Sequence, residues 1–112
     1  MLSVNPKTQE IQITRGDTLR VTFGATKNGQ PYAFANGDKL KFYLNIPNAK
    51  VGSAPKLSID IPTATGELYI SSEQTKDLIT TDYLYDIELT KANGDVDTII
   101  NRKSFKVLGE VG

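Results

Sequence analysis

The chain contains neither cysteine nor histidine, and these two absences exclude several kinds of chemistry. Without cysteine, no disulfide framework, thiolate nucleophile or Cys-ligated metal centre can form. Without histidine, the chain lacks the side chain most often used as a general base and as a transition-metal ligand. Catalysis would have to depend on carboxylates, lysine or tyrosine. We therefore expect a protein that is not an enzyme, and we assign no catalytic, cofactor-binding or metal-binding residue.

An excess of charge of one sign is also missing, because thirteen Lys and Arg residues balance thirteen Asp and Glu residues. A net charge of zero gives no long-range field that would attract nucleic acid or an anionic membrane. Long apolar runs are absent too, and the first seven residues have neither the apolar core nor the cleavage site of a signal peptide. We expect neither nucleic acid nor a membrane among the partners, and a chain that stays where it is made unless another factor exports it.

Three turns of the form x-Gly-Asp are present, at Arg15–Asp17, Asn36–Asp38 and Asn93–Asp95. Glycine supplies the positive φ of a tight reversal, while Asn and Asp tolerate it and hydrogen-bond to their own backbone. Alternating apolar and polar residues follow each turn, as in a strand with one buried face. At 112 residues, the chain is long enough for one domain with its own core. We expect a single domain over residues 1–112, with its core at about 8–108.

The alternation predicts strands over residues 8–14, 19–25, 40–46, 57–61, 68–70, 83–89 and 96–107, with a brief extended piece over 31–34. In the last strand, the apolar residues change from even to odd positions, which predicts a β-bulge near Asn101–Lys103. Residues 47–55 have no periodicity and are rich in turn formers, so they are expected to form a long exposed loop.

One short helix is expected after Ser71. Gln74 follows Ser71 at the spacing of a capping box, and a short polar stretch comes next. Leu78 or Ile79 would be buried beneath this helix.

About seven strands with frequent turn signals are typical of a two-sheet β-sandwich. We therefore predict an all-β, immunoglobulin-like β-sandwich of about seven strands with one short helix. The stretch Asp82–Ile87 resembles the tyrosine corner of such folds, and either Tyr83 or Tyr85 could take that role. The Cys and Trp hallmarks of antibody domains are absent.

Several candidate sites each have a simpler structural explanation. Arg15–Asp17 matches the tripeptide that integrins recognise, but a turn between strands explains the same residues. Asp95 and Asp97 could share a calcium ion, although Asp in a hairpin turn normally caps the backbone. Asp86 and Glu88 could form a glycosidase-like pair, although a solvated sheet face is the simpler reading.

The aromatic residues could form a stacking platform for carbohydrate or single-stranded nucleic acid. Basic residues are not interleaved with them as a nucleic-acid platform requires. Tyr43 differs, because it shares the polar face of its strand with Lys39 and Lys41, which is as consistent with a protein interface as with ligand stacking. The residues considered are Tyr32, Phe34, Tyr43, Tyr69, Tyr83 and Tyr85.

Five segments, taken in order along the chain, carry a family resemblance: Ile13–Leu19, Asn36–Phe42, Tyr85–Leu89, Asn93–Asp95 and Phe105–Val107. Together they resemble the N-terminal domain of baseplate upper proteins, and related small structural modules, of tailed bacteriophages that infect Gram-positive bacteria. The likeness covers about Thr8 to Val107, and it depends on the order and spacing of the segments.

The resemblance implies a virion module that docks onto other phage structural proteins and has no catalytic residues. It implies synthesis in the cytoplasm of the host bacterium, localisation in the virion, and a homo-oligomer or many symmetric copies. The sequence ends soon after the last strand, at Gly109–Gly112, with no region to hold a receptor-binding protein. A capsid decoration or head–tail accessory protein is therefore the alternative. A carbohydrate-binding β-sandwich module is a second alternative, which predicts a concave aromatic face.

Overall fold

The computed structural model describes the backbone of residues 2–5, 9–50 and 52–110, and the side chains of the last two of these ranges. The elements follow one another as β1 (Leu2–Asn5), β2 (Ile11–Thr14), β3 (Leu19–Thr22), β4 (Gly24–Lys27), β5 (Gln30–Pro31), β6 (Lys39–Asn45), β7 (Leu57–Ile61), β8 (Glu67–Ile70), α1 (Ser72–Lys76), β9 (Asp82–Thr90) and β10 (Val96–Leu108). The chain is therefore mostly β, as the alternation predicted. Among the described residues, no helix is long and apolar enough to cross a membrane.

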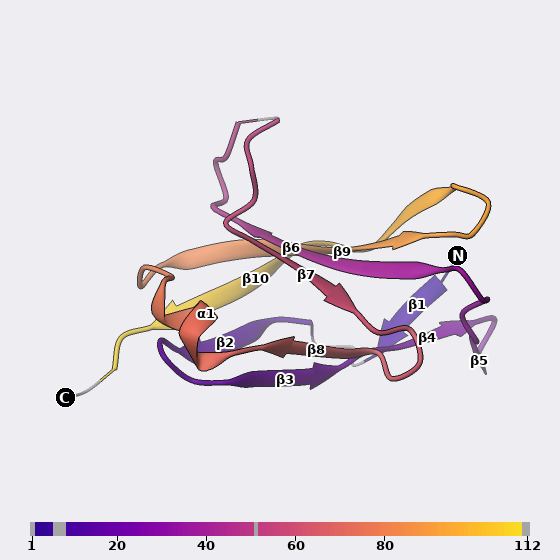
Figure 1. The fold of residues 1–112 in the computed structure, drawn as a ribbon, viewed down its shortest axis with the longest axis horizontal. Coiled ribbons are helices and arrows are strands. Elements are labelled where there is room, and N and C mark those ends of the chain that lie inside the picture. The colour runs from indigo at the N-terminus through magenta and orange to yellow at the C-terminus, as the bar shows by residue number, and fades with distance from the viewer. Residues whose placement is uncertain (1, 6–8, 51, 111–112) are drawn as a thin grey trace.

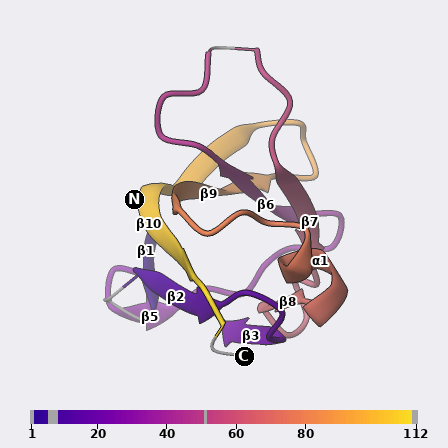
Figure 2. The same cartoon turned by 90° about the vertical axis from the view of Figure 1, so that its left-hand side faces the viewer.

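The strands are divided among three sheets. The largest has five strands in the order β2-β10-β9-β6-β7, and its first pair, β2 with β10, is parallel. The two smaller sheets have the orders β1-β4-β5 and β3-β8. In Figure 1, β6, β7, β9 and β10 lie above β3 and β8, so that the core lies between two layers. Figure 2 shows the same arrangement from one end of the molecule.

The number of strands differs from the expected seven for two reasons. The predicted strand over 19–25 is divided at Phe23, because β3 pairs with β8 and β4 pairs with β1. At the division, Phe23 N–H donates to the carbonyl of Gly66 (2.8 Å). Gly66 has φ +69°, and a Cβ there would lie 2.3 Å from the Phe23 carbonyl oxygen, so the crossing requires glycine. The alternation of buried and exposed residues nevertheless continues across it.

The second difference concerns the ends of the predicted elements. No strand was expected before Thr8, yet β1 pairs with β4 in register Leu2 to Lys27. Residue 8 itself lies outside the described part of the chain. The extended piece predicted over 31–34 is also wrong in extent, since the strand there is only Gln30–Pro31. Its pairing with β4 depends on tertiary contacts that alternation does not record.

The β-bulge in β10 is confirmed. The register between β9 and β10 shifts between Thr98 and Ile100 and again between Ile100 and Lys103. Within the second shift, Arg102 has φ 52°, which is left-handed and uncommon for a residue with a side chain. The bulge allows Ile100 and Phe105, which have opposite parity in the sequence, both to face the core.

The core is centred on three aromatic rings from three strands of the largest sheet. The Phe42 and Tyr85 rings lie 5.4 Å apart, and Phe42 and Phe105 lie 5.9 Å apart, at tilted angles favourable for aromatic pairs. All three are fully buried. The Tyr85 hydroxyl donates to the backbone carbonyl of Gln9, so its one polar group is paired. Burial raises the pKa of Tyr85 to about 12.

The helix α1 begins at the predicted capping box. Ser71 accepts a hydrogen bond from the Gln74 backbone N–H (3.2 Å), and Gln74 Oε1 accepts one from the Ser71 N–H (2.9 Å). Leu78 is buried after the helix, while Ile79 is exposed, which decides between the two residues expected there. The Tyr83 hydroxyl donates to the carbonyl of Ile79, four residues earlier in the chain (3.1 Å). The Tyr85 hydroxyl instead bonds to Gln9, which is distant in the sequence.

Candidate functional site

A polar hollow of about 280 Å³ lies between the β6–β7 connection and the outer face of the largest sheet. Tyr43 and Asn45 of β6, Asp86 of β9 and Arg102 of the β10 bulge line its sheet side, and Lys50 lies on the loop side. In Figures 1 and 2 the loop rises away from the rest of the molecule. The predicted exposed loop is confirmed, since residues 47–50 and 52–55 are exposed except for half-buried Ala49.

Hydrogen bonds hold the base of this loop. Arg102 Nη2 donates to the Pro47 carbonyl (3.3 Å), and Asn45 Nδ2 donates to the Ala54 carbonyl (3.4 Å). The Lys56 N–H donates to the Leu44 carbonyl (2.7 Å), which closes the loop onto the start of β7. The loop is thus anchored at both ends while its tip is presented to solvent.

The bulge aims Arg102 at the hollow. Its left-handed backbone directs the Arg102 N–H to Asp86 Oδ1 at 2.6 Å, a short charge-assisted hydrogen bond. Asp86 therefore caps the bulge, and the Arg102 guanidinium reaches the loop. The bulge was predicted at this position, but Arg102 was not among the candidate site residues. The change of parity in the apolar pattern was the signal that could have found it.

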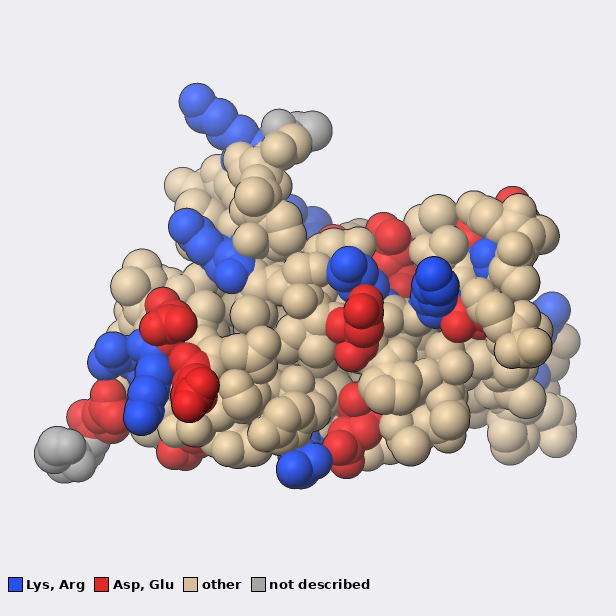
Figure 3. All heavy atoms as spheres, in the orientation of Figure 1, with Lys and Arg blue, Asp and Glu red and all other residues tan. Residues whose placement is uncertain are grey.

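A second, larger hollow of about 570 Å³ lies on the other side of Tyr43, over β6, β7 and β9. Lys41 is central there, because Lys41 Nζ lies 3.8 Å from Asp60 Oδ1 and 5.9 Å from the centre of the Tyr43 ring. Glu88 is the register partner of Lys41 on β9. In Figure 3 the charged side chains are scattered over this side of the molecule and do not gather by sign. Surface pairs of this kind contribute little to stability.

The four carboxylates of the two acidic pairs lie in different surroundings. Asp86 is committed to the bulge, and Glu88 lies two residues further along β9, beside Lys41. Asp95 belongs to its own turn, where Asn93 Oδ1 accepts from the Asp95 N–H (2.9 Å) and Asn93 Nδ2 donates to Asp95 Oδ2 (3.3 Å). Across the ranges 9–50 and 52–110, no three Asp or Glu side chains gather into a group that could hold a metal ion.

The six aromatic residues do not form one platform. Tyr83 and Tyr85 are buried in the core, and Tyr32 packs edge-on against Phe34 at 5.4 Å. Tyr69 lies on β8, where the Arg20 guanidinium stacks over its ring at 4.4 Å. Tyr43 is the one that lines a hollow of the outer sheet face, as its place beside two lysines suggested.

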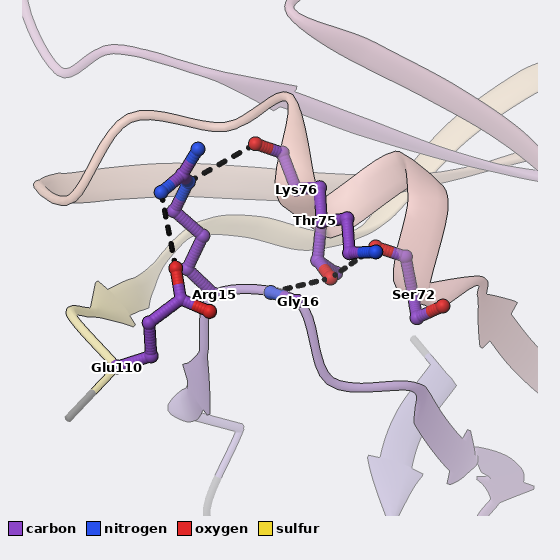
Figure 4. Close-up of polar contacts among 6 residues, drawn as sticks. All are labelled: Arg15, Gly16, Ser72, Thr75, Lys76 and Glu110. Atoms are coloured by element: carbon purple, nitrogen blue, oxygen red, sulfur yellow. Dashed lines mark hydrogen bonds and ion pairs between the residues drawn. The ribbon is translucent and has the colours of Figure 1, made fainter. Parts of the chain in front are cut away.

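The Arg15–Asp17 turn is docked against α1, as Figure 4 shows. Arg15 Nε donates to the Lys76 carbonyl (3.0 Å), and Arg15 Nη1 pairs with Glu110 Oε1 (3.1 Å). The Gly16 N–H donates to the fully buried Thr75 hydroxyl (3.0 Å). Asp17 is exposed, and the Arg15 side chain remains partly exposed despite these contacts. The turn therefore binds its own domain through Arg15 and Gly16.

Comparison with models of known protein families gives no match, and neither does comparison with curated proteins.

Proposed function

We propose that this chain is a non-enzymatic structural or adaptor module of a bacteriophage particle, an immunoglobulin-like β-sandwich that acts by docking onto other proteins. The resemblance of its ordered segments to baseplate upper proteins motivates the phage assignment. The docking mechanism is supported by the anchored β6–β7 loop, which presents a tip to solvent from a base held by Arg102 and Asn45.

Two features favour the immunoglobulin-like architecture. The order β10-β9-β6-β7 corresponds to the G-F-C-C′ sheet of such domains, with β3 and β8 in the opposite layer as strands B and E. The Tyr83 hydroxyl at the start of β9 donates back to Ile79, as a tyrosine corner does. Tyr83 is thus the better candidate for that role.

The test is incorporation into particles. We expect mass spectrometry of purified virions to find the chain at a copy number that matches a symmetric position in the particle. A variant whose loop residues 48–54 are replaced by a short Gly-Ser link removes the presented tip but leaves the strands. It should fold and be missing from particles, because the docking contact is lost.

A matched control changes another exposed hairpin. Lys91→Ala with Asp97→Ala alters the β9–β10 end without touching the loop, and it should enter particles normally. Absence of the unaltered chain from particles would refute the structural role. Normal incorporation of the shortened-loop variant would show that the loop is not the docking element.

The position in the particle separates the two phage alternatives. A baseplate module should remain with isolated tails, whereas a capsid decoration or head–tail accessory protein should remain with heads. Fractionation of disrupted virions followed by mass spectrometry distinguishes them.

A second candidate, a carbohydrate-binding module, is favoured by one observation. The hollow beside the loop combines the half-exposed ring of Tyr43 with hydrogen-bonding groups of Asn45, Asp86 and Arg102. An aromatic face with polar partners is the chemistry that holds a sugar. Retention on a glycan array that Tyr43→Ala abolishes would support this function, and a blank array would remove it.

A further inference from the structure

One edge of the largest sheet is open. β7 is the last strand in the order β2-β10-β9-β6-β7, and within the described ranges no strand pairs with its outer side. An edge strand presents unpaired backbone N–H and C=O groups, which are a template for another strand. Proteins often protect such edges with proline, and Pro55 and Pro62 lie just outside β7 without occupying it.

The side chains of this edge leave it free to pair. Leu57 and Ile59 are half-buried against the core, while Ser58 and Asp60 point to solvent. The Asp60 side chain is 89% exposed and meets Lys41 only at 3.8 Å. Lys56 is also exposed and makes its backbone bond to β6.

Apolar side chains lie next to the edge, together with the polar side chains of Gln74 and Asp77. A hollow of about 260 Å³ is lined by Lys56 and Leu57 at one side and by Leu78 and Ile79 at the other. Ile79 is 69% exposed, the most exposed large apolar side chain of the described residues. Ile79 is thus an exposed apolar side chain that lies close to the free strand edge.

The sequence of the edge is complementary to itself. If two copies of β7 pair antiparallel about Ser58, Lys56 of each copy faces Asp60 of the other. In the same register Leu57 faces Ile59, so that both the charged and the apolar positions match. Moving the centre to Ile59 would place Asp60 opposite Ser58 and leave Lys56 opposite Pro62. Cross-strand pairs of opposite charge and of apolar residues stabilise antiparallel pairing.

We propose that the β7 edge binds the β7 edge of a second copy of this chain, antiparallel and centred on Ser58, so that two five-stranded sheets join into one. The contact is isologous, since the same patch serves both copies about a two-fold axis. The inference deepens the proposed function and rests on it, because it names the surface through which copies of a docking module associate.

A charge exchange tests the register. Light scattering over a range of protein concentrations should show a monomer–dimer equilibrium for the unaltered chain. Asp60→Lys and Lys56→Glu should each weaken dimerisation about tenfold or more, because each places two like-charged pairs across the interface. The double variant Lys56→Glu with Asp60→Lys restores opposite charges and should restore the dimer. Lys41→Ala is the matched control, since it removes the intramolecular partner of Asp60 and should leave the dimer intact.

Backbone pairing has its own readout. Amide hydrogen exchange within residues 57–61 should slow as protein concentration rises, while exchange in β3 should not change. A chain that stays monomeric at every concentration, or a dimer that Asp60→Lys leaves unaffected, would overturn the proposal. These outcomes are separable from the proposed function: a monomer that is still found in particles would refute the edge pairing alone, and a dimer missing from particles would refute the phage role alone.

Discussion

The three x-Gly-Asp turns share a pattern in the sequence and differ in what each one binds. In the first, the Gly16 amide bonds to α1. In the second, the buried Asp38 carboxylate accepts from the Ala35 N–H (2.9 Å) and from the Ala92 N–H (3.1 Å). In the third, the bonds of Asp95 stay within its own turn. Turns with the same local sequence pattern thus contribute differently to stability, because each one contacts different neighbouring segments.

Asp38 is expected to be the most important of these acids for stability. Asp38→Ala leaves two backbone amides without their acceptor, so the free energy of unfolding should fall by about 2 to 3 kcal/mol. Asp95→Ala, in an exposed turn, should change it by less than about 0.5 kcal/mol. Urea denaturation of the two variants measures the difference. Equal effects would contradict the role assigned to Asp38.

The buried phenol of Tyr85 makes the free energy of unfolding depend on pH in the alkaline range. Burial raises its pKa from the ordinary value of 10.0 to about 12 in the folded chain, so its proton is held more tightly there than in the unfolded chain. The stabilisation that this shift provides is complete below pH 10. It is lost as pH rises from about 10 to about 12, and the total loss is roughly 2 to 3 kcal/mol. Burial also raises the pKa of Tyr83, in the same direction.

Denaturation with urea at pH 8 and at pH 11 measures this loss. The unaltered chain should lose stability between the two values, and Tyr85→Phe should lose less, because no phenol remains to ionise at that position. Tyr83→Phe should still show the loss of stability that ionisation of Tyr85 causes. An identical pH dependence for Tyr85→Phe and the unaltered chain would contradict the assignment.

Among the elements, α1 is too short to be stable by itself, and Thr75 fixes it to the β2–β3 turn. The buried Thr75 hydroxyl accepts from the Gly16 N–H and lies 2.8 Å from the Asp17 carbonyl, to which it donates. Thr75→Val keeps the shape but removes these bonds, so we expect a loss of about 1 to 3 kcal/mol. Thr75→Ser keeps the hydroxyl and should lose about 1 kcal/mol for the missing methyl group. Thermal unfolding compares them, and a smaller loss for Thr75→Val would contradict the hydrogen-bonding role.

The β10 bulge gives predictions of different size for two substitutions at one position. Arg102 holds a left-handed φ, which a β-branched residue tolerates poorly and glycine adopts freely. Arg102→Val should destabilise the chain by about 1 to 2 kcal/mol. Arg102→Gly should cost less than that, since relief of strain offsets the lost Pro47 contact. Lys103→Val, one residue on, is the control and should be nearly neutral. Chemical denaturation that finds a lower free energy of unfolding for Arg102→Gly than for Arg102→Val would contradict the bulge geometry.

At the scale of the whole molecule, the core joins the sheets into one cooperative unit. Phe23, Leu68 and Ile70 from the smaller layer belong to the same buried cluster as Phe42 and Phe105. We therefore expect one two-state unfolding transition, coincident by far-UV circular dichroism and by tyrosine fluorescence. Separate transitions would show that the β1-β4-β5 sheet unfolds by itself.

The alternation of apolar and polar residues predicted most of the strands because side chains on a half-buried strand alternate between core and solvent. It located the β6, β7 and β9 strands, and the change of parity near Asn101–Lys103 located the bulge. The capping box at Ser71 and Gln74 is a contact within one turn of chain, so the helix start was also predictable. The candidate site was predicted only in part, through Tyr43 and the loop.

Sequence by itself determined the class of fold and the positions of the turns in this protein, because both depend on neighbours along the chain. Only the tertiary structure decided what depends on neighbours in space. It divided the 19–25 strand between two partners, directed Arg102 at the β6–β7 loop, gave Asp38 and Asp95 unequal surroundings, and left the β7 edge open. The physical reason is that burial and pairing arise between segments far apart in sequence, which local periodicity cannot record.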